Sequence, residues 1–191
     1  MQQDIEEEYI LDVLRNYTTY ATAFQLYQKV QGGEMKPVPV TDAEGNTVMV
    51  DESEATKGLM RWVKLHPTNI SQKVQIIVEH FRVHVAHLLE GRAKAMVVTD
   101  SRKAAVRWKL AIDEYIKSRG YTDVAALVAF SDKVTDDNGG QLPEQEFSEA
   151  SMNAQLGGQD LRTAFAGDEY RVMIVANKFQ TGFDEPLLSA M

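Results

Sequence analysis

The sequence has no cysteine, only five prolines among 191 residues, and no long apolar run. The absence of cysteine excludes disulfide frameworks, thiolate zinc sites, iron–sulfur clusters and cysteine nucleophiles, and it fits a reducing compartment. The longest apolar run is Val124–Phe130, far short of the roughly 20 residues that a membrane span needs. The first eight residues are polar and acidic, unlike a signal peptide. We therefore expect a soluble, cytoplasmic protein without a membrane partner.

The first ninety residues are predicted to be mostly helical. Apolar and aromatic side chains recur at helical spacing over residues 5–30, which predicts a long amphipathic helix. Alternating valines around Glu44-Gly45-Asn46 predict a hairpin over about residues 36–51. Helices are expected over 53–65, capped by Ser53, and over 69–90, ended by Gly91. We assign residues 1–91 to this helical segment with its hairpin.

The pattern changes after Gly91 to one of strands and helices in alternation. Strand-like runs at 95–99 and 124–130 flank a helix that Asp100 or Ser101 caps and Gly120 ends, which is a βαβ unit with a parallel sheet. The polar stretch 131–145 is expected to be a loop. Short helices are expected around 147–154 and 160–166, followed by a third strand at 170–176. The fold class is therefore α/β over residues 92–191.

Charge is distributed unevenly along the chain. The net charge of −8 argues against nucleic acid, because cationic side chains supply most of that affinity. Residues 92–119, however, hold eight bases and three acids. A local basic segment is a better indicator of nucleic-acid binding than the sum. The alternative is a solvated helix face rich in lysine and arginine.

Three histidines, His80, His84 and His87, share one face of the expected helix. That spacing could hold a metal ion. No cysteine and no HExxH order accompany them, so ordinary half-buried or solvated histidines are the favoured interpretation. We assign no metal site and no catalytic triad.

The sequence lacks both common glycine-rich phosphate loops, since none of its 12 glycines is followed by lysine and no G-x-G-x-x-G occurs. Parallel α/β sheets bind ligands at the carboxyl ends of their strands. Ser101 and Arg102 follow the first strand and open a helix, so a hydroxyl, a guanidinium and backbone N–H groups could converge on an anion. A helix cap with a surface arginine is the alternative. Ser131 and Thr181–Asp184 follow the other two strands.

Three segments carry a resemblance to a known family. Val172–Pro186, which contains Asn-Lys-Phe-Gln-Thr-Gly-Phe-Asp-Glu-Pro, resembles motif V of superfamily 2 helicases in the form found in the R subunits of type I restriction enzymes. Lys94–Arg102 resembles motif IV of the same family, and Ile10–Tyr20 resembles the helical stretch ahead of their second RecA-like domain. The resemblance implies a RecA-like parallel sheet flanked by helices, the P-loop NTPase-type helicase C-terminal domain.

The resemblance also implies an activity, which is ATP-driven translocation of double-stranded DNA in the restriction of foreign DNA. Its site residues would be Thr99, Ser101 and Arg102 on a DNA phosphate, with Ser131 at the same edge of the sheet. Thr181 and Gly182 would contact the DNA backbone or relay the ATP state, and Asp184 would face the nucleotide cleft. The implied partners are the first RecA-like domain and the methylation and specificity subunits. The parent enzyme would be a type I deoxyribonuclease using ATP and Mg²⁺.

The sequence also departs from this family. It has no phosphate loop, no acidic Mg²⁺ motif, no recognisable nuclease site and no arginine pair of motif VI, because it stops shortly after motif V. We therefore expect a fragment that binds no cofactor, hydrolyses no ATP and cuts no DNA by itself. The alternatives are another superfamily 2 translocase, or a nonenzymatic module that docks a protein through five aromatic residues. These are Tyr9, Tyr17, Tyr20, Phe24 and Tyr27.

Overall fold

The computed structural model describes residues 38–41, 47–50, 52–138, 142–179 and 183–191. The chain divides into two compact units, Met1–Val63 and Lys64–Met191. The helix expected over residues 5–30, with its aromatic side chains, lies outside the described residues. In the first unit, β1 (Val38–Thr41) and β2 (Thr47–Val50) pair antiparallel, with Val38 opposite Val50. The predicted hairpin is thus confirmed.

Two helices connect the hairpin to the sheet. The helix α3 (Glu52–Leu65) begins one residue before Ser53, so the predicted cap at Ser53 is wrong. The next helix, α4 (Pro67–His80), begins earlier than predicted because His66 caps it, its Nδ1 accepting a hydrogen bond from the N–H of Thr68 at 3.3 Å. Proline at the first helical position lacks only an N–H that would have no helical partner there.

The helix predicted to run to residue 90 is irregular beyond His80. A π-helical turn, η1 (Phe81–Val85), follows directly, and the short α5 (Leu88–Gly91) contains left-handed backbone at Leu89 (φ 52°) and Glu90 (φ 59°). The guanidinium of Arg171 donates to the carbonyl oxygens of Ala86 and Ala93 on either side of α5. These bonds give both carbonyl oxygens a partner where the chain leaves the helix.

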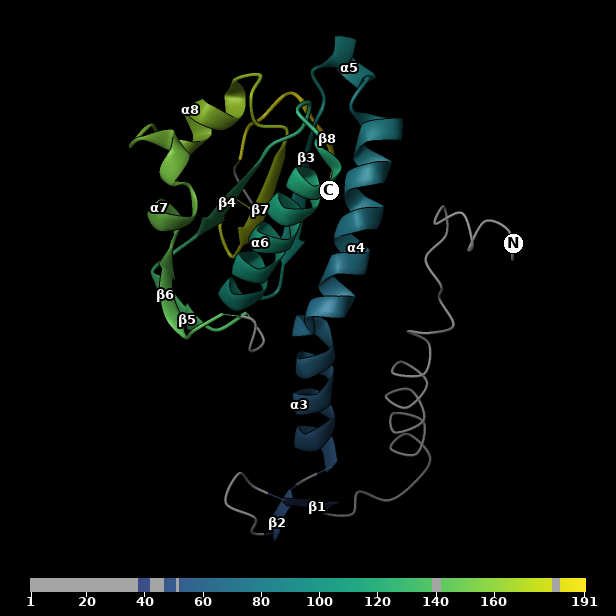
Figure 1. The fold of residues 1–191 in the computed structure, drawn as a ribbon, viewed down its shortest axis with the longest axis vertical. Coiled ribbons are helices and arrows are strands. Elements are labelled where there is room, and N and C mark those ends of the chain that lie inside the picture. The colour runs from purple at the N-terminus through teal and green to yellow at the C-terminus, as the bar shows by residue number, and fades with distance from the viewer. Residues whose placement is uncertain (1–37, 42–46, 51, 139–141, 180–182) are drawn as a thin grey trace, which may run out of the picture. The chain divides into compact units, whose positions relative to one another are not determined.

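A four-stranded parallel sheet forms the centre of the second unit (Figure 1). The strand order is β4-β7-β3-β8. Although β7 follows β3 and β4 in the sequence, it lies between them in the sheet. The helix α6 (Arg102–Arg119) connects β3 to β4. The predicted βαβ unit and third strand are confirmed, and β8 is additional. The strands are β3 (Lys94–Thr99), β4 (Ala126–Phe130), β7 (Val172–Ala176) and β8 (Leu188–Ala190).

Both ends of α6 follow from its sequence. Ser101 has extended backbone, and its Oγ accepts a hydrogen bond from the N–H of Ala104 at 3.2 Å. Gly120 ends the helix with φ 66°, a conformation that costs glycine little because it has no Cβ. Of the two caps that the sequence allowed, the structure selects Ser101.

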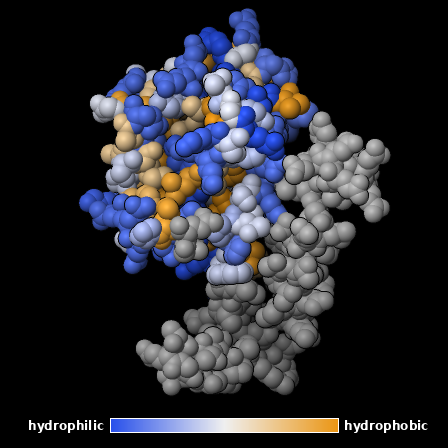
Figure 2. Space-filling view, viewed as in Figure 1, coloured by the Kyte–Doolittle hydropathy of each residue, from blue (hydrophilic) through white to orange (hydrophobic). Residues whose placement is uncertain are grey.

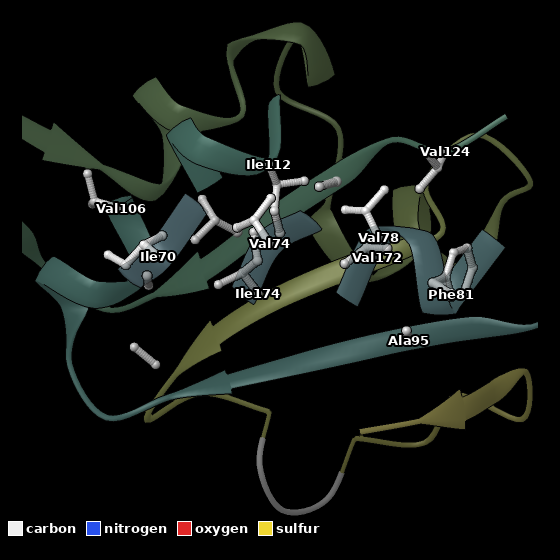
Figure 3. Close-up of a cluster of buried hydrophobic side chains, with 14 of the residues drawn as sticks. Ile70, Val74, Val78, Phe81, Ala95, Val106, Ile112, Val124, Val172 and Ile174 are labelled. Atoms are coloured by element: carbon white, nitrogen blue, oxygen red, sulfur yellow. The ribbon is translucent and has the colours of Figure 1, made fainter. Parts of the chain in front are cut away.

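Helices cover both faces of the sheet. Side chains of α4 and α6 pack on one face, where Ile70, Val74 and Val78 meet Val172 and Ile174 of β7 (Figure 3). The alternate residues of the strands form a second core with α8 (Leu161–Ala166) on the other face. Burial on both faces explains why the strands read as continuous apolar runs.

The second compact unit therefore includes α4, whereas the sequence placed a boundary after Gly91.

The face drawn in Figure 2 mixes hydrophilic residues with smaller hydrophobic patches. Among the described residues, no helix has the length and apolar character needed to cross a bilayer.

The polar stretch 131–145 is predicted to be a loop, but residues 133–136 and 145 lie in two paired strands, so the prediction is wrong at those residues. β5 (Lys133–Asp136) and β6 (Gln145–Ser148) pair antiparallel. Only alternate side chains, those of Val134 and Phe147, join the core, so the segment reads as polar. The predicted helix at 147–154 is present as two short pieces, α7 (Glu149–Met152) and the 3₁₀ turn η2 (Ala154–Leu156), and the helix at 160–166 is confirmed as α8.

Candidate nucleic-acid interface

The carboxyl ends of three strands meet at one edge of the sheet. Ala176 of β7 is in register with Thr99 of β3 on one side and with Phe130 of β4 on the other. Ser131 therefore follows its strand at the same edge as Thr99. We refer to this place as the carboxyl edge. Of the other predicted site residues, Thr181 and Gly182 lie outside the described residues, and Asp184 is exposed.

Arg102 begins α6 at the carboxyl edge and is the exposed cation of the predicted anion site. Its Nη1 donates to the carbonyl oxygen of Ser131 at 3.3 Å and lies 3.4 Å from Oδ2 of Asp132. The side chain is 44% exposed and that of Asp132 is 84% exposed. The first N–H groups of a helix have no helical partner, and its N-terminus attracts anions. One guanidinium thereby joins the start of α6 to the residues that follow β4.

Thr99 and Ser101 direct their hydroxyls to the protein backbone. The hydroxyl of Thr99 donates to the carbonyl oxygen of Val175 at 2.9 Å, and Thr99 is only 7% exposed. Ser101 caps α6, as described above. These two side chains position the ends of β3 and α6, whereas Arg102 reaches solvent.

The basic segment 92–119 is not one surface. Lys94 and Lys109 are buried, and the side chain of Arg107 is only 10% exposed. Lys94 donates to the carbonyl oxygens of Gly167 and Tyr170, and burial lowers its pKa. Three of the eight bases are thus within the fold and not on its surface, so the segment is not simply a solvated helix face.

Arg107 forms a buried ion pair with two short contacts near the edge. Its Nε and Nη2 each lie 2.7 Å from an oxygen of Asp136, whose side chain is 1% exposed. Its Nη1 donates to the carbonyl oxygen of Leu65 at 2.7 Å. Burial raises the pKa of Asp136, but the hydrogen bonds and charge of Arg107 outweigh it and hold that pKa below its usual value. Paired hydrogen bonds of this kind hold the two side chains in a defined geometry in addition to contributing energy.

The exposed lysines around Arg102 also have carboxylate partners. Lys64 Nζ lies 3.0 Å from Oδ2 of Asp100, and Lys103 Nζ lies 3.8 Å from Oδ1 of Asp136. Cations and carboxylates therefore alternate along this part of the carboxyl edge. A polyanion binding here would have to compete with carboxylates of the protein itself.

Two polar residues of the edge were missed in the sequence. Glu149 accepts from the N–H of Phe130 at 3.0 Å and from Nζ of Lys178 at 2.7 Å. Asn153, 4% exposed, bonds both the N–H and the carbonyl oxygen of Val128, at 3.0 and 2.7 Å. Neither has a spacing signal, because each serves a strand far from its own helix. Together they pair the outer side of the edge strand β4.

A hollow of about 350 Å³ opens beside these residues. Lys178 and Phe179 form part of its wall, opposite α7 and α8. Its charged groups bond within the protein, Lys178 to Glu149 and Asp160 to the N–H of Thr163. The hollow thus adjoins the carboxyl edge without adding an unpaired charge to it.

The histidines stay outside this site. The rings of His80 and His84 lie 4.9 Å apart, and all three predicted histidines are exposed. Within the described ranges, no group of three or more potential ligands is placed to hold a metal ion.

Comparison with known proteins gives one informative likeness. A Methanocaldococcus jannaschii protein assigned as the type I restriction enzyme MjaVIIIP endonuclease subunit is 26% identical over 164 residues, which cover 75% of this chain and 15% of that protein. No family model matches the sequence. The chain is thus distantly similar to a restriction-enzyme subunit and spans a small part of its length.

Proposed function

We propose that this chain is part of the ATP-dependent DNA translocase motor of a type I restriction endonuclease R subunit. Its carboxyl edge would contact the DNA backbone through Arg102, with Ser131 beside it and Thr99 and Ser101 positioning the ends of β3 and α6. Thr181 is proposed to add a backbone contact. Gly182 and Asp184 would form one side of the ATP cleft.

One observation carries the proposal. The residues that resemble motif IV end in Arg102, and Arg102 is the side chain that reaches from the start of α6 to the end of β4 with part of its guanidinium in solvent. Arginine suits phosphate because its planar group can donate two parallel hydrogen bonds. The distant likeness to the restriction-enzyme subunit also supports the proposal.

The parent protein would supply the parts that this chain lacks. ATP and Mg²⁺ would be held with the first RecA-like domain, and the methylation and specificity subunits would complete the complex. The chain alone is expected neither to hydrolyse ATP nor to cut DNA, because it contains no phosphate loop and no arginine pair of motif VI. DNA-dependent ATPase activity of the purified chain would contradict this.

DNA binding of the chain can be measured by fluorescence anisotropy with a short duplex. Arg102→Ala is expected to weaken binding about tenfold, because one charge-assisted phosphate contact is lost. The slope of log affinity against log salt should decrease by about one. Arg92→Ala is the matched control, since Arg92 is also exposed but precedes β3 and so lies at the opposite edge.

An equal loss of DNA affinity in the two variants, or no loss in Arg102→Ala, would overturn the assignment of the carboxyl edge as the DNA-binding surface. In the full-length subunit, Arg102→Ala should also lower DNA-stimulated ATP hydrolysis and translocation. If the chain is instead a nonenzymatic protein-docking module, Arg102→Ala should leave ATP hydrolysis and translocation by the full-length subunit unchanged.

A further inference from the structure

Arg102 and Arg107 lie on the same helix, but their carboxylate partners hold them very differently. Arg107 meets both oxygens of the buried Asp136 at 2.7 Å. Arg102 meets one oxygen of Asp132 at 3.4 Å, and the two side chains are 44% and 84% exposed. The first pair is built into the fold, whereas the second can separate without exposing a buried charge.

An exposed single contact of this kind stabilises a protein only weakly. A DNA phosphate can offer two oxygens to the same guanidinium, and it brings the charge of the whole duplex with it. Phosphate should therefore win the competition with Asp132 at moderate salt. The carboxylate still lowers the apparent affinity, since DNA must first displace it.

The backbone keeps Asp132 beside Arg102. Asp132 directly follows Ser131, whose carbonyl oxygen accepts from the same Nη1, and it has left-handed backbone with φ 60°. Left-handed backbone is unfavourable for most residues and is best tolerated by asparagine and aspartate. The turn thus holds a carboxylate at the point where a phosphate oxygen would approach Arg102.

We propose that the carboxylate of Asp132 is a stand-in for phosphate: it binds Arg102 in the free protein, at the position that a DNA phosphate takes in the complex. DNA displaces this carboxylate, so Asp132 sets the DNA affinity of the carboxyl edge. This inference rests on the proposed function. It concerns a residue that makes no favourable contact with DNA and acts through Arg102.

The test is Asp132→Asn, measured by anisotropy with the same short duplex at fixed salt. Asparagine tolerates the left-handed backbone and removes only the charge. Asp168→Asn is the matched control, because Asp168 is 88% exposed and lies 4.0 Å from Arg92 at the opposite edge. Both substitutions change the net charge equally. Thermal unfolding of each variant verifies that it is folded.

We expect Asp132→Asn to tighten DNA binding about two- to fivefold, the range that an exposed ion pair supports. Asp168→Asn should change it less. In an Arg102→Ala background, Asp132→Asn should lose most of its effect, because the cation that it frees is gone. This coupling distinguishes displacement from general charge repulsion.

Three results would overturn the inference. They are no tightening by Asp132→Asn, equal tightening by Asp168→Asn, and an undiminished effect in the Arg102→Ala background. If Arg102→Ala itself bound DNA as the unaltered chain does, the proposed function would fail first. If Arg102→Ala weakened binding while Asp132→Asn changed nothing, only the stand-in role would fail.

Discussion

Glu149 accepts hydrogen bonds from the backbone N–H of Phe130 and from the ammonium group of Lys178. Phe130 ends β4, and Lys178 comes two residues after the end of the neighbouring β7. One carboxylate therefore fastens the ends of two adjacent parallel strands at the carboxyl edge. The backbone on both sides of Lys178 is left-handed, at Asn177 (φ 53°) and Phe179 (φ 61°), so this fastening opposes local strain.

Glu149→Ala is expected to lower the free energy of unfolding by about 1–3 kcal/mol, the cost of removing a charged acceptor from partly buried donors. Hydrogen exchange of the Phe130 amide should accelerate, whereas the Val128 amide, which Asn153 holds, should stay protected. Glu146→Ala is the control, because the pair of Glu146 with Lys133 is exposed, and its loss should cost under about 0.5 kcal/mol. An unchanged Phe130 exchange rate would show that the bond contributes little in solution.

Asn153 supplies the donor and the acceptor that a further strand would offer to Val128. Asn153→Leu, similar in size, should lower the free energy of unfolding by about 1–3 kcal/mol for each backbone group left unpaired. The same change should promote concentration-dependent association, because an unpaired strand edge invites pairing with another chain. Urea denaturation and light scattering measure the two effects, and a variant of unaltered stability would argue against this role.

The ion pair between Arg107 and Asp136 should contribute to the stability of the protein at neutral pH. Asp136→Asn should lower the free energy of unfolding by about 3 kcal/mol at neutral pH, since it removes the buried carboxylate that pairs with a nearly buried guanidinium. Asp137→Asn should lower it much less, because Asp137 lies 3.4 Å from Arg107 and its side chain is 47% exposed.

The sign of the pH effect follows from the pKa of Asp136, which is lowered in the folded protein. A lowered carboxyl pKa stabilises the protein above the unfolded value, about 3.9, and that stabilisation is lost as pH falls through the folded pKa. The difference between the unaltered chain and Asp136→Asn should therefore be constant from about pH 5 to 7 and shrink below about pH 4. Urea denaturation as a function of pH measures it, and a difference that grew in acid would contradict the prediction.

Ser101 allows helix capping to be separated from DNA binding. Ser101→Ala should lower the free energy of unfolding by about 1 kcal/mol, because the N–H of Ala104 loses its acceptor. Ser101→Asp should keep the cap and the stability but weaken DNA binding, since it adds a negative charge beside Arg102. Thermal unfolding and anisotropy distinguish the two, and tighter DNA binding by Ser101→Asp would place the DNA elsewhere.

The placement of α4 in the core can be tested within that helix. Ile70 is 2% exposed and Ile76 is 64% exposed. Ile70→Ala should lower the free energy of unfolding by about 2–5 kcal/mol, and Ile76→Ala by no more than about 0.5 kcal/mol. Urea denaturation gives both values. Similar losses at the two positions would mean that α4 is not packed as described.

The parts of the fold that sequence reasoning predicted are those with local signals. The apolar runs of β3, β4 and β7 and the two ends of α6, at Ser101 and Gly120, are visible in the sequence because their causes lie within a few residues. The β5–β6 hairpin has too few inward side chains to show a pattern, and the turn at Leu89 and Glu90 depends on Arg171, some eighty residues later.

The same distinction applies to the candidate site. The meeting of Thr99 and Ser131 at one edge follows from the rule for parallel strands, so it could be predicted. The inward role of Arg107 could not, because it depends on Asp136 in a hairpin that the sequence did not reveal. Asp132 and Glu149 gain their roles only from tertiary neighbours.

The order of the sheet has a consequence for synthesis of the protein. β3 and β4 do not touch each other, because β7 lies between them and pairs with both. At about 5–20 residues per second, a ribosome needs a few seconds to pass from the end of β4 to the end of β7. Until then, the nascent chain can dock its helices on neither face of a finished sheet, and β3 and β4 stay without their shared partner. The period of greatest exposure to chaperones and to aggregation therefore ends no earlier than the synthesis of residues 172–176.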